Sequence, residues 1–420
     1  VTSVRYNVKI NGALSDSFAS SCGLRQGDPI SPFLFLFVID GLDALLKQEI
    51  EATRISPLRV CPQAPGISHL LFADDTLLFF RANAVEAAHV RAVLERYAAA
   101  TGQIVNPNKC SIMFGPSCSE VNKQEVMHTL EVANVSFEEK YLGFPTPNGR
   151  LSKGKLKSVQ QQLTKRIIQW GELMSQAGRE FLIKAVAQAL PTFLMSIFKF
   201  PRSTCDDLAR MIRSYWWGAY RGKRKTHWKA WDHLLRPKAA GGMGFKDFRM
   251  FNQALLARQA WRLLVNPESL CARVLKARYY PNGRLEDTVF STNASQTWQS
   301  IVHGLELLKQ GLIWRIGNGR SVRIWRDPWI PHPTGRPPIS QQGRCRLRRV
   351  SELLDEMGAW RSDLLQQYFL PVDVHHIMKI KASPRLGDDF IAWGAERTGI
   401  FTVRSAYRLA LEDKLRPSSV

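Results

Sequence analysis

Short alternating runs of hydrophobic and polar residues predict β-strands in the first part of the chain. Residues 4–10 alternate and lead into Asn11-Gly12, a dipeptide typical of two-residue hairpin turns. Residues 68–80 contain two apolar runs, each short enough for a buried strand, with Asp74-Asp75 between them. The pattern therefore predicts a second hairpin that holds both carboxylates at its tip. An isolated Asp-Asp pair would by itself favour a simple structural turn.

Apolar residues at helical spacing predict helices over most of the remaining chain. Ser31 is expected to cap the first helix, with Pro32 at its first position and its first two turns buried. A turn at Asn318-Gly319 predicts a third hairpin, and residues 399–404 alternate like a strand. The predicted helices cover residues 33–50, 84–101, 156–170, 179–190, 251–264, 270–279 and 298–308.

A glycine-rich stretch, residues 23–32, precedes the first predicted helix. Glycines before a helix allow the backbone to approach phosphates or bases closely. A tight strand-to-helix connection would explain the same glycines without any ligand. The stretch gains significance from the carboxylate pair downstream, because together the two patterns suggest a nucleotide site.

The two patterns together resemble the palm of a reverse transcriptase, in particular that of plant non-LTR (LINE-type) retrotransposons. Phe-Ala-Asp-Asp at residues 72–75 matches that family's Tyr-x-Asp-Asp box, and residues 26–32 match its template-and-nucleotide loop. Asn106 and Lys109 fall in the next palm motif, and Tyr141-Leu142-Gly143 resembles the primer-grip turn. Four motifs occur in family order, and the helices from residue 149 resemble the family's thumb. The resemblance implies an α+β fold, a partial polymerase palm followed by a mainly helical thumb and a mixed C-terminal region.

The resemblance also implies a function, that of an RNA-directed DNA polymerase joining nucleotides by a two-metal mechanism. The implied cofactors are two Mg²⁺ or Mn²⁺ ions, and the implied partners are an RNA template, a DNA primer and deoxynucleoside triphosphates. Asp74 is the firmer metal ligand and Asp75 the secondary one. Lys109 would protonate the leaving pyrophosphate, although a loop lysine is more often a solvated charge. The residues implied to contact template or nucleotide are Gln26, Gly27, Asp28, Pro29 and Asn106.

The family requires one more carboxylate, on a strand before the glycine loop. Residues 1–23 contain no matching motif, since Asp16 belongs to a polar turn and not to the end of an apolar strand. Asp28, Asp40 and Asp43 belong to the loop and the helix, so they are poor substitutes. We therefore expect an N-terminally truncated chain that does not polymerise by itself.

The charge of the chain favours a polyanionic partner. Lys and Arg number 58 against 36 Asp and Glu, which gives a formal charge of +22. Basic and aromatic residues alternate between residues 202 and 238, as in single-strand binding platforms. Trp216 and Trp217 are expected in the core, and Trp228 and Trp231 on one packed face. The residues predicted to contact nucleic acid are Lys155, Lys165, Arg166, Lys223, Arg224 and Lys225.

The segments suggest four parts: a partial palm at 1–148, a helical thumb at 149–215, a basic, Trp-rich region at 216–335, and a linker with a small C-terminal domain at 336–420. Seven scattered cysteines and no secretory signature predict a nuclear or cytoplasmic protein. No apolar run approaches the length of a membrane-spanning helix. Two alternatives remain open: a non-catalytic nucleic-acid-binding protein, and, less well matched, a nucleotide cyclase with a similar palm.

Overall fold

The computed structural model describes residues 4–19, 23–25, 27–135, 140–142, 144–145, 153–170, 174–218, 225–288, 294–332, 334–381 and 387–415. The chain divides into two compact units, Val1–Thr146 with Arg273–Arg278, and Pro147–Ala272 with Tyr279–Val420. Helices and small antiparallel sheets make up both units, which confirms the predicted α+β class. In the described part of the chain, no helix is both long and apolar enough to cross a membrane.

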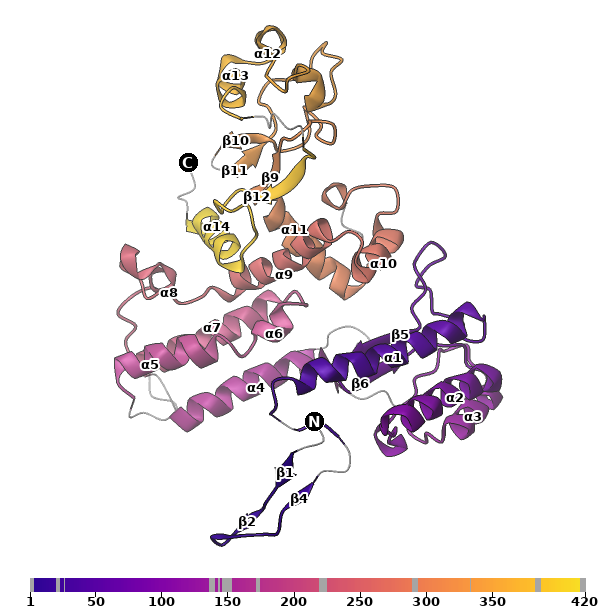
Figure 1. Cartoon of the computed structure of the whole chain (residues 1–420). Helices are drawn as coiled ribbons and strands as arrows, with labels where there is room; N and C mark the ends of the chain where they lie inside the picture. Colours follow the sequence, from indigo (N-terminus) through magenta and orange to yellow (C-terminus); the bar gives the residue numbers. More distant parts are fainter. Residues whose placement is uncertain are drawn as a thin grey trace. The chain divides into compact units, whose positions relative to one another are not determined.

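In its described residues up to 145, the first unit contains four short two-stranded antiparallel ladders and three α-helices (Figure 1). In the first ladder Ile10 pairs with Ala13 across Asn11 and Gly12, whose φ angles of 49° and 91° are the left-handed values that such a two-residue turn requires. The predicted first hairpin is thus confirmed. The elements are β1 (Arg5–Tyr6), β2 (Lys9–Ile10), β3 (Ala13–Leu14), β4 (Phe18–Ala19), α1 (Ser31–Glu51), β5 (His69–Phe72), β6 (Asp75–Leu78), α2 (Ala84–Thr101), η1 (Pro107–Lys109), α3 (Glu120–Leu130), β7 (Lys140–Tyr141) and β8 (Phe144–Pro145).

The core of this unit lies between α1, α2 and the β5–β6 hairpin. Leu42 and Leu46 of α1 pack with Val90, Val93 and Tyr97 of α2. The prediction that the first turns of α1 are buried is wrong: Phe33, Leu36 and Phe37 are exposed, Phe37 by 78%. The buried face begins further along because the residues that pack against α1 contact its C-terminal half. Ser31 is also not the cap; Ile30 holds that position without a side-chain hydrogen bond.

The second unit begins with an amphipathic helix whose buried stripe agrees with the sequence pattern. Leu156, Val159, Leu163 and Ile167 of α4 are all buried. The helix predicted at 179–190 starts earlier, as α5, and continues into a π-helical turn, η2. These elements share one core with α7 and α9. The elements up to α11 are α4 (Lys153–Trp170), α5 (Gln176–Leu182), η2 (Ile183–Ala187), α6 (Thr192–Met195), α7 (Arg202–Trp217), α8 (Trp231–Leu235), η3 (Lys238–Ala240), α9 (Phe248–Val265), α10 (Leu270–Tyr279), η4 (Leu285–Asp287) and α11 (Gln296–Gly311).

The remaining residues form small sheets and short helices, and one of the sheets pairs strands that are far apart in the sequence. The hairpin predicted at Asn318-Gly319 does not form, because β9 pairs antiparallel with β12 instead. The strand predicted at 399–404 is likewise absent, and helix α14 begins at Val403. The elements are β9 (Leu312–Arg315), β10 (Ile330–His332), β11 (Thr334–Arg336), η5 (Val350–Leu353), α12 (Ser362–Tyr368), α13 (Pro371–Ile377), β12 (Phe390–Trp393) and α14 (Val403–Leu415).

A half-buried carboxylate distant in the sequence explains why the loop after β9 does not return as a hairpin. Asp389 accepts hydrogen bonds from the backbone N–H groups of Gly317, Gly319 and Ser321 at 2.8–2.9 Å. Those amides are therefore satisfied by a residue some 70 positions away.

The segment expected to be a linker is also packed, since the side chains of Ser340 and Cys345 are buried. The proposed four-part division itself remains a prediction.

Candidate functional site

The β5–β6 hairpin holds the two adjacent carboxylates at its tip. Phe72 pairs with Asp75, so Ala73 and Asp74 form a two-residue turn, and Ala73 has the positive φ of 50° that such turns need. The side chains of Asp74 and Asp75 are exposed. The prediction of a hairpin with both carboxylates at its end is confirmed in its geometry.

The other end of the hairpin is fixed to helix α1. Leu71 and Leu78 pack against the core of α1 and α2. His69 Nε2 lies 2.8 Å from Asp43 Oδ1, while Ser68 Oγ lies 2.9 Å from His69 Nδ1. Burial raises the pKa of Asp43, but hydrogen bonds from Lys47 and His69 outweigh this and lower it. The base of the hairpin is thus anchored by apolar packing and a polar chain, and its tip extends from a rigid support.

The loop before α1 has the backbone that its glycines suggested. Gly23 and Gly27 have φ angles of 83° and 85°, which side chains disfavour. The Asp28 carboxylate accepts a hydrogen bond from the Ile30 N–H at 3.0 Å, and Ser31 Oγ donates to the Arg25 carbonyl at 2.8 Å. Asp28 is therefore engaged in shaping the loop. Pro29 follows it directly, while Gln26 lies outside the described residues.

Two adjacent exposed carboxylates suit a hard divalent cation, which prefers oxygen ligands. In the ranges that the structure describes, no three or more His, Cys, Asp or Glu side chains gather as a metal-binding group. Asp74 and Asp75 thus fit a divalent ion by the chemistry of their oxygens, and they supply only part of a ligand set. The pair remains the strongest candidate for chemistry in this unit.

The other predicted palm residues lie on separate elements of the first unit. Asn106 caps η1, where its side chain accepts from the Asn108 N–H at 3.1 Å, and Lys109 is exposed at the end of that turn. Residues 110–115, which follow η1, form no strand. Leu142, with φ of 50°, stands between β7 and β8, next to Tyr141; Gly143 lies outside the described residues.

The basic residues predicted to contact nucleic acid are partly described. Lys165 and Arg166 are exposed on α4, and Lys225 is exposed beyond α7. Lys155 belongs to α4, but its side chain falls outside the described part, as do Lys223 and Arg224 altogether.

The tryptophans differ from expectation at one position. Trp216 is buried and Trp217 is partly buried against the same core, as predicted. Trp231 stacks on Phe245 with 5.7 Å between ring centroids. Trp228, in contrast, is 78% exposed, so the prediction that it shares a packed face with Trp231 is wrong. The spacing of three residues misled because helix α8 begins only at Trp231.

Two further groups stand outside the predicted site residues: the first gave no signal in the sequence, and the second was expected only as a linker whose four arginines at 344–349 could bind phosphate. The anchor between His69 and Asp43 joins residues 26 positions apart, so no local pattern indicates it. The arginines between residues 315 and 349 gather on one part of the second unit. Their number was a visible signal, since that segment contains nine arginines and one acidic residue.

Comparisons with known proteins identify a family model for the first part of the chain and several relatives. A model of the reverse transcriptase (RNA-dependent DNA polymerase) family matches residues 2–146. An uncharacterized mitochondrial protein of Arabidopsis thaliana is 40% identical over 153 residues, which are 36% of this chain and 99% of that protein. Another protein of the same plant, whose name refers to ribonuclease H, is 28% identical over 286 residues, 65% of this chain and 46% of that protein.

A third relative is similar over a shorter stretch. A retrovirus-related Pol polyprotein from the type-1 retrotransposable element R2 of Popillia japonica is 31% identical over 119 residues, which are 28% of this chain and 18% of the polyprotein. The chain therefore spans nearly all of the first relative and less than half of the other two.

Proposed function

Since a model of the reverse transcriptase (RNA-dependent DNA polymerase) family matches residues 2–146, we propose that the chain derives from the polymerase of a plant non-LTR, LINE-type retrotransposon. In this proposal the β5–β6 hairpin supplies two carboxylates to a two-metal nucleotidyl-transfer site. Its substrates are an RNA template, a DNA primer and deoxynucleoside triphosphates.

One observation carries the proposal: the matched region places Asp74 and Asp75 at the exposed tip of a hairpin whose base is anchored. A two-residue turn allows little freedom at the tip, and the Ala73 backbone already has the required conformation. Packing of Leu71 and Leu78 and the contact between His69 and Asp43 restrain the base. Such rigidity suits phosphoryl transfer, in which catalysis depends mainly on positioning and charge.

The carboxylates would hold divalent ions through their oxygens. Bound ions at such a site activate the attacking hydroxyl and neutralise charge on the leaving pyrophosphate. Asp74, in the turn, is proposed as the firmer ligand, and Asp75, which belongs to strand β6, as the secondary one. Lys109 is proposed to donate a proton toward the leaving group. The loop of Gly27, Asp28 and Pro29 would shape the nucleotide pocket, with backbone amides near the start of α1.

Two carboxylates are an incomplete set for two ions, so we propose that this chain alone does not extend a primer. The direct test is therefore metal binding. We expect the chain to bind Mn²⁺, followed by the loss of the free-ion electron paramagnetic resonance signal, and Asp74→Asn to weaken this binding roughly tenfold, or about 1.4 kcal/mol. Asp75→Asn should have a smaller effect. Asp40→Asn, an exposed carboxylate on α1 of the same unit, removes the same charge and should change little.

Equal Mn²⁺ binding by the wild type and Asp74→Asn would refute the assignment of the tip as a metal site. A second measurement, extension of an oligo(dT) primer on poly(rA) with magnesium, tests the proposed incompleteness. Robust extension by the chain as given would show that its ligand set is complete. Extension that survives Asp74→Asn would leave the hairpin as a structural turn.

A second candidate function is nucleic-acid binding without catalysis. It is favoured by the exposed Trp228, which stands between the exposed Lys225 and Lys229. Aromatic faces stack on unpaired bases while neighbouring cations meet phosphates. Nucleic-acid binding that is unaffected by Asp74→Asn, together with an absence of Mn²⁺ binding at the tip, would favour this candidate over the polymerase.

A further inference from the structure

Arginine is concentrated in one segment of the second unit. Between residues 315 and 349 there are nine arginines, no lysine and a single acidic residue, Asp327. Two of the nine form an ion pair with a buried carboxylate: Arg336 pairs with Asp373, and Arg323 pairs with Asp327. The excess of positive charge is therefore large, and it resides in one type of side chain.

The tertiary structure brings two stretches of this segment side by side. Arg323 and Arg349 form an antiparallel bridge, the Ile324 N–H donates to the Arg348 carbonyl at 2.9 Å, and the Val350 N–H donates to the Val322 carbonyl at 3.1 Å. Val322, Ile324 and Val350 are buried in the core below. Seven of the nine arginines are exposed. Five of these lie on or beside the two paired stretches, and we call them the arginine surface: Arg320, Arg326, Arg346, Arg348 and Arg349.

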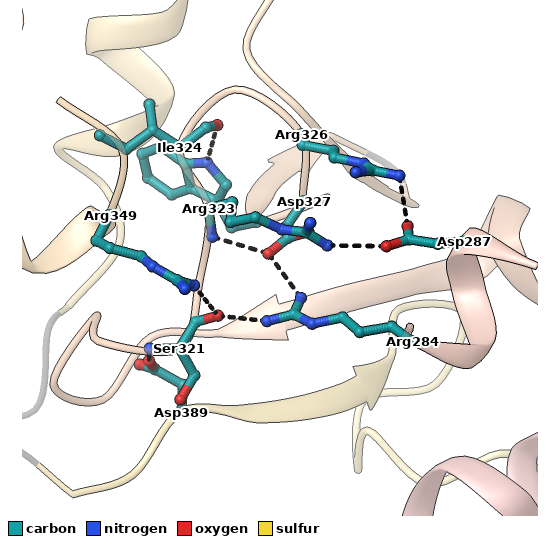
Figure 2. A network of polar contacts seen from close by, with 10 residues as sticks. Arg284, Asp287, Ser321, Arg323, Ile324, Arg326, Asp327, Arg349 and Asp389 are labelled. Carbon is teal, nitrogen blue, oxygen red and sulfur yellow. Dashed lines mark hydrogen bonds and ion pairs between the residues drawn. The ribbon is translucent and has the colours of Figure 1, made fainter. Parts of the chain in front are cut away.

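Carboxylates beneath this surface hold several guanidinium groups in fixed positions (Figure 2). Asp327, only 5% exposed, contacts Arg284 at 3.1 Å and Arg323 at 3.3 Å. Asp287 contacts Arg326 at 2.8 Å and Arg323 at 3.4 Å. Four guanidinium groups are thus joined in one network, because Arg349 enters it through the Ser321 carbonyl, which also accepts from Arg284. Asp327 and Asp287 are the carboxylates that contact these guanidinium groups among the described residues.

Two other nearby acids, Glu352 and Asp389, accept from the backbone, and Asp388 accepts from the Asn318 side chain at 3.2 Å. Glu352 accepts hydrogen bonds from the N–H groups of Arg348 and Arg349 at 2.6 and 2.7 Å, and Asp389 accepts from three amides of the loop after β9. The side chains of Arg320, Arg346 and Arg348 form no hydrogen bond or ion pair with the residues that the structure describes. Their positive charge is open to an external partner.

We propose that the arginine surface binds the phosphate backbone of a nucleic acid. A guanidinium group matches two phosphate oxygens with two parallel N–H donors, which a lysine cannot do. Groups already held in position lose less entropy when they bind. The contact lies outside the palm hairpin and helix α4. It goes beyond the polymerase proposal and does not depend on it, because it requires only a polyanion with regularly spaced phosphates.

The test uses the full chain and the triple variant Arg320→Gln, Arg346→Gln, Arg348→Gln. Binding of a fluorescein-labelled 20-nucleotide RNA and of a 20-base-pair RNA duplex is followed by anisotropy over a range of NaCl concentrations. Each lost phosphate contact lowers the slope of log K against log salt by about 0.7–0.9, so the variant should lose about 2 units of slope and at least tenfold in affinity.

A matched control separates a dedicated surface from overall charge. The variant Arg258→Gln, Arg404→Gln, Arg408→Gln removes three exposed arginines from the same unit and should retain affinity within about twofold. A triple change to lysine at 320, 346 and 348 keeps the charge and loses the paired donors, so it should recover the slope but only part of the affinity. Thermal unfolding should be the same for all variants, since every changed side chain is exposed.

Three results would overturn the proposal. Equal losses in the test and control variants would mean that only total charge matters. Unchanged RNA binding by the test variant would exclude this surface as the contact. Unchanged RNA binding together with lost binding to phosphatidylserine vesicles would identify an anionic membrane as the partner. None of these outcomes depends on Asp74, so the proposal and the polymerase assignment fail separately.

Discussion

Replacement of Trp228 by alanine should separate nucleic-acid stacking from protein stability. The side chain is 78% exposed, so only about a fifth of its surface is buried in the folded protein. A tryptophan has roughly 250 Å² to bury, and a fifth of that at about 25 cal/mol per Å² gives at most about 1.3 kcal/mol of stability. Truncation of the fully buried Trp298 should instead cost about 3–5 kcal/mol.

The expected effect on binding is larger. Trp228 lies between Lys225 and Lys229, and its neighbour His227 stacks on Trp217 of α7 at 5.9 Å, which holds the segment against the helical core. One base stacked on an aromatic ring contributes about 1–3 kcal/mol, so Trp228→Ala should weaken single-stranded RNA binding about 5- to 150-fold. Trp228→Phe keeps an aromatic face and should lose much less.

The assay is anisotropy with a labelled single-stranded RNA over a series of NaCl concentrations. Because the tryptophan carries no charge, Trp228→Ala should lower affinity at every salt concentration without changing the slope. Lys229→Gln is the complementary control, and it should reduce the slope by about 0.7. Wild-type affinity in Trp228→Ala would refute the stacking argument. A changed slope would mean that the substitution had moved the neighbouring cations.

Two further predictions concern the stability of the second unit. Burial raises the pKa of the Asp373 carboxyl, but hydrogen bonds from Ser340 and the charge of Arg336 outweigh it, so the folded-state pKa is lowered. Asp373→Asn should therefore cost about 3–5 kcal/mol at neutral pH, and in urea unfolding this difference should shrink as the pH falls through the folded pKa, below about 3.9; a constant difference would contradict the assignment. Gly304→Ala would place a Cβ 2.2 Å from the Leu256 backbone where α11 crosses α9, so it should cost about 3 kcal/mol or more, whereas Gly283→Ala meets nothing within 4 Å and should be nearly neutral by thermal unfolding.

The sequence by itself determined the elements that depend on neighbouring residues, such as tight turns, short strands and amphipathic helices. The turn at Asn11-Gly12 and the Asp74-Asp75 hairpin formed as predicted, because turn residues and short apolar runs act over a few positions. The buried stripe of α4 was equally predictable, since helical periodicity depends on neighbours three or four residues away. The sequence also contained the reverse transcriptase motifs, which the family match over residues 2–146 supports.

Only the tertiary structure decided which apolar and charged side chains are covered. Periodicity placed Phe33 and Phe37 on an apolar face of the first helix. It could not show that only the C-terminal half of α1 is packed against the core, which leaves both side chains exposed. Trp228 and Trp231 are three residues apart, which is a helical spacing, but helix α8 contains only Trp231.

The pairing of β9 with β12 and the capture of the loop at Gly317 and Gly319 by Asp389 join residues about 70 positions apart. A local turn signal at Asn318-Gly319 did not produce a hairpin there, because the amides of that loop donate to the half-buried Asp389 carboxylate and not to a neighbouring strand. The arginine surface has the same origin: its composition is visible in the sequence, but the bridge between Arg323 and Arg349 that assembles it depends on long-range packing, which no local pattern encodes.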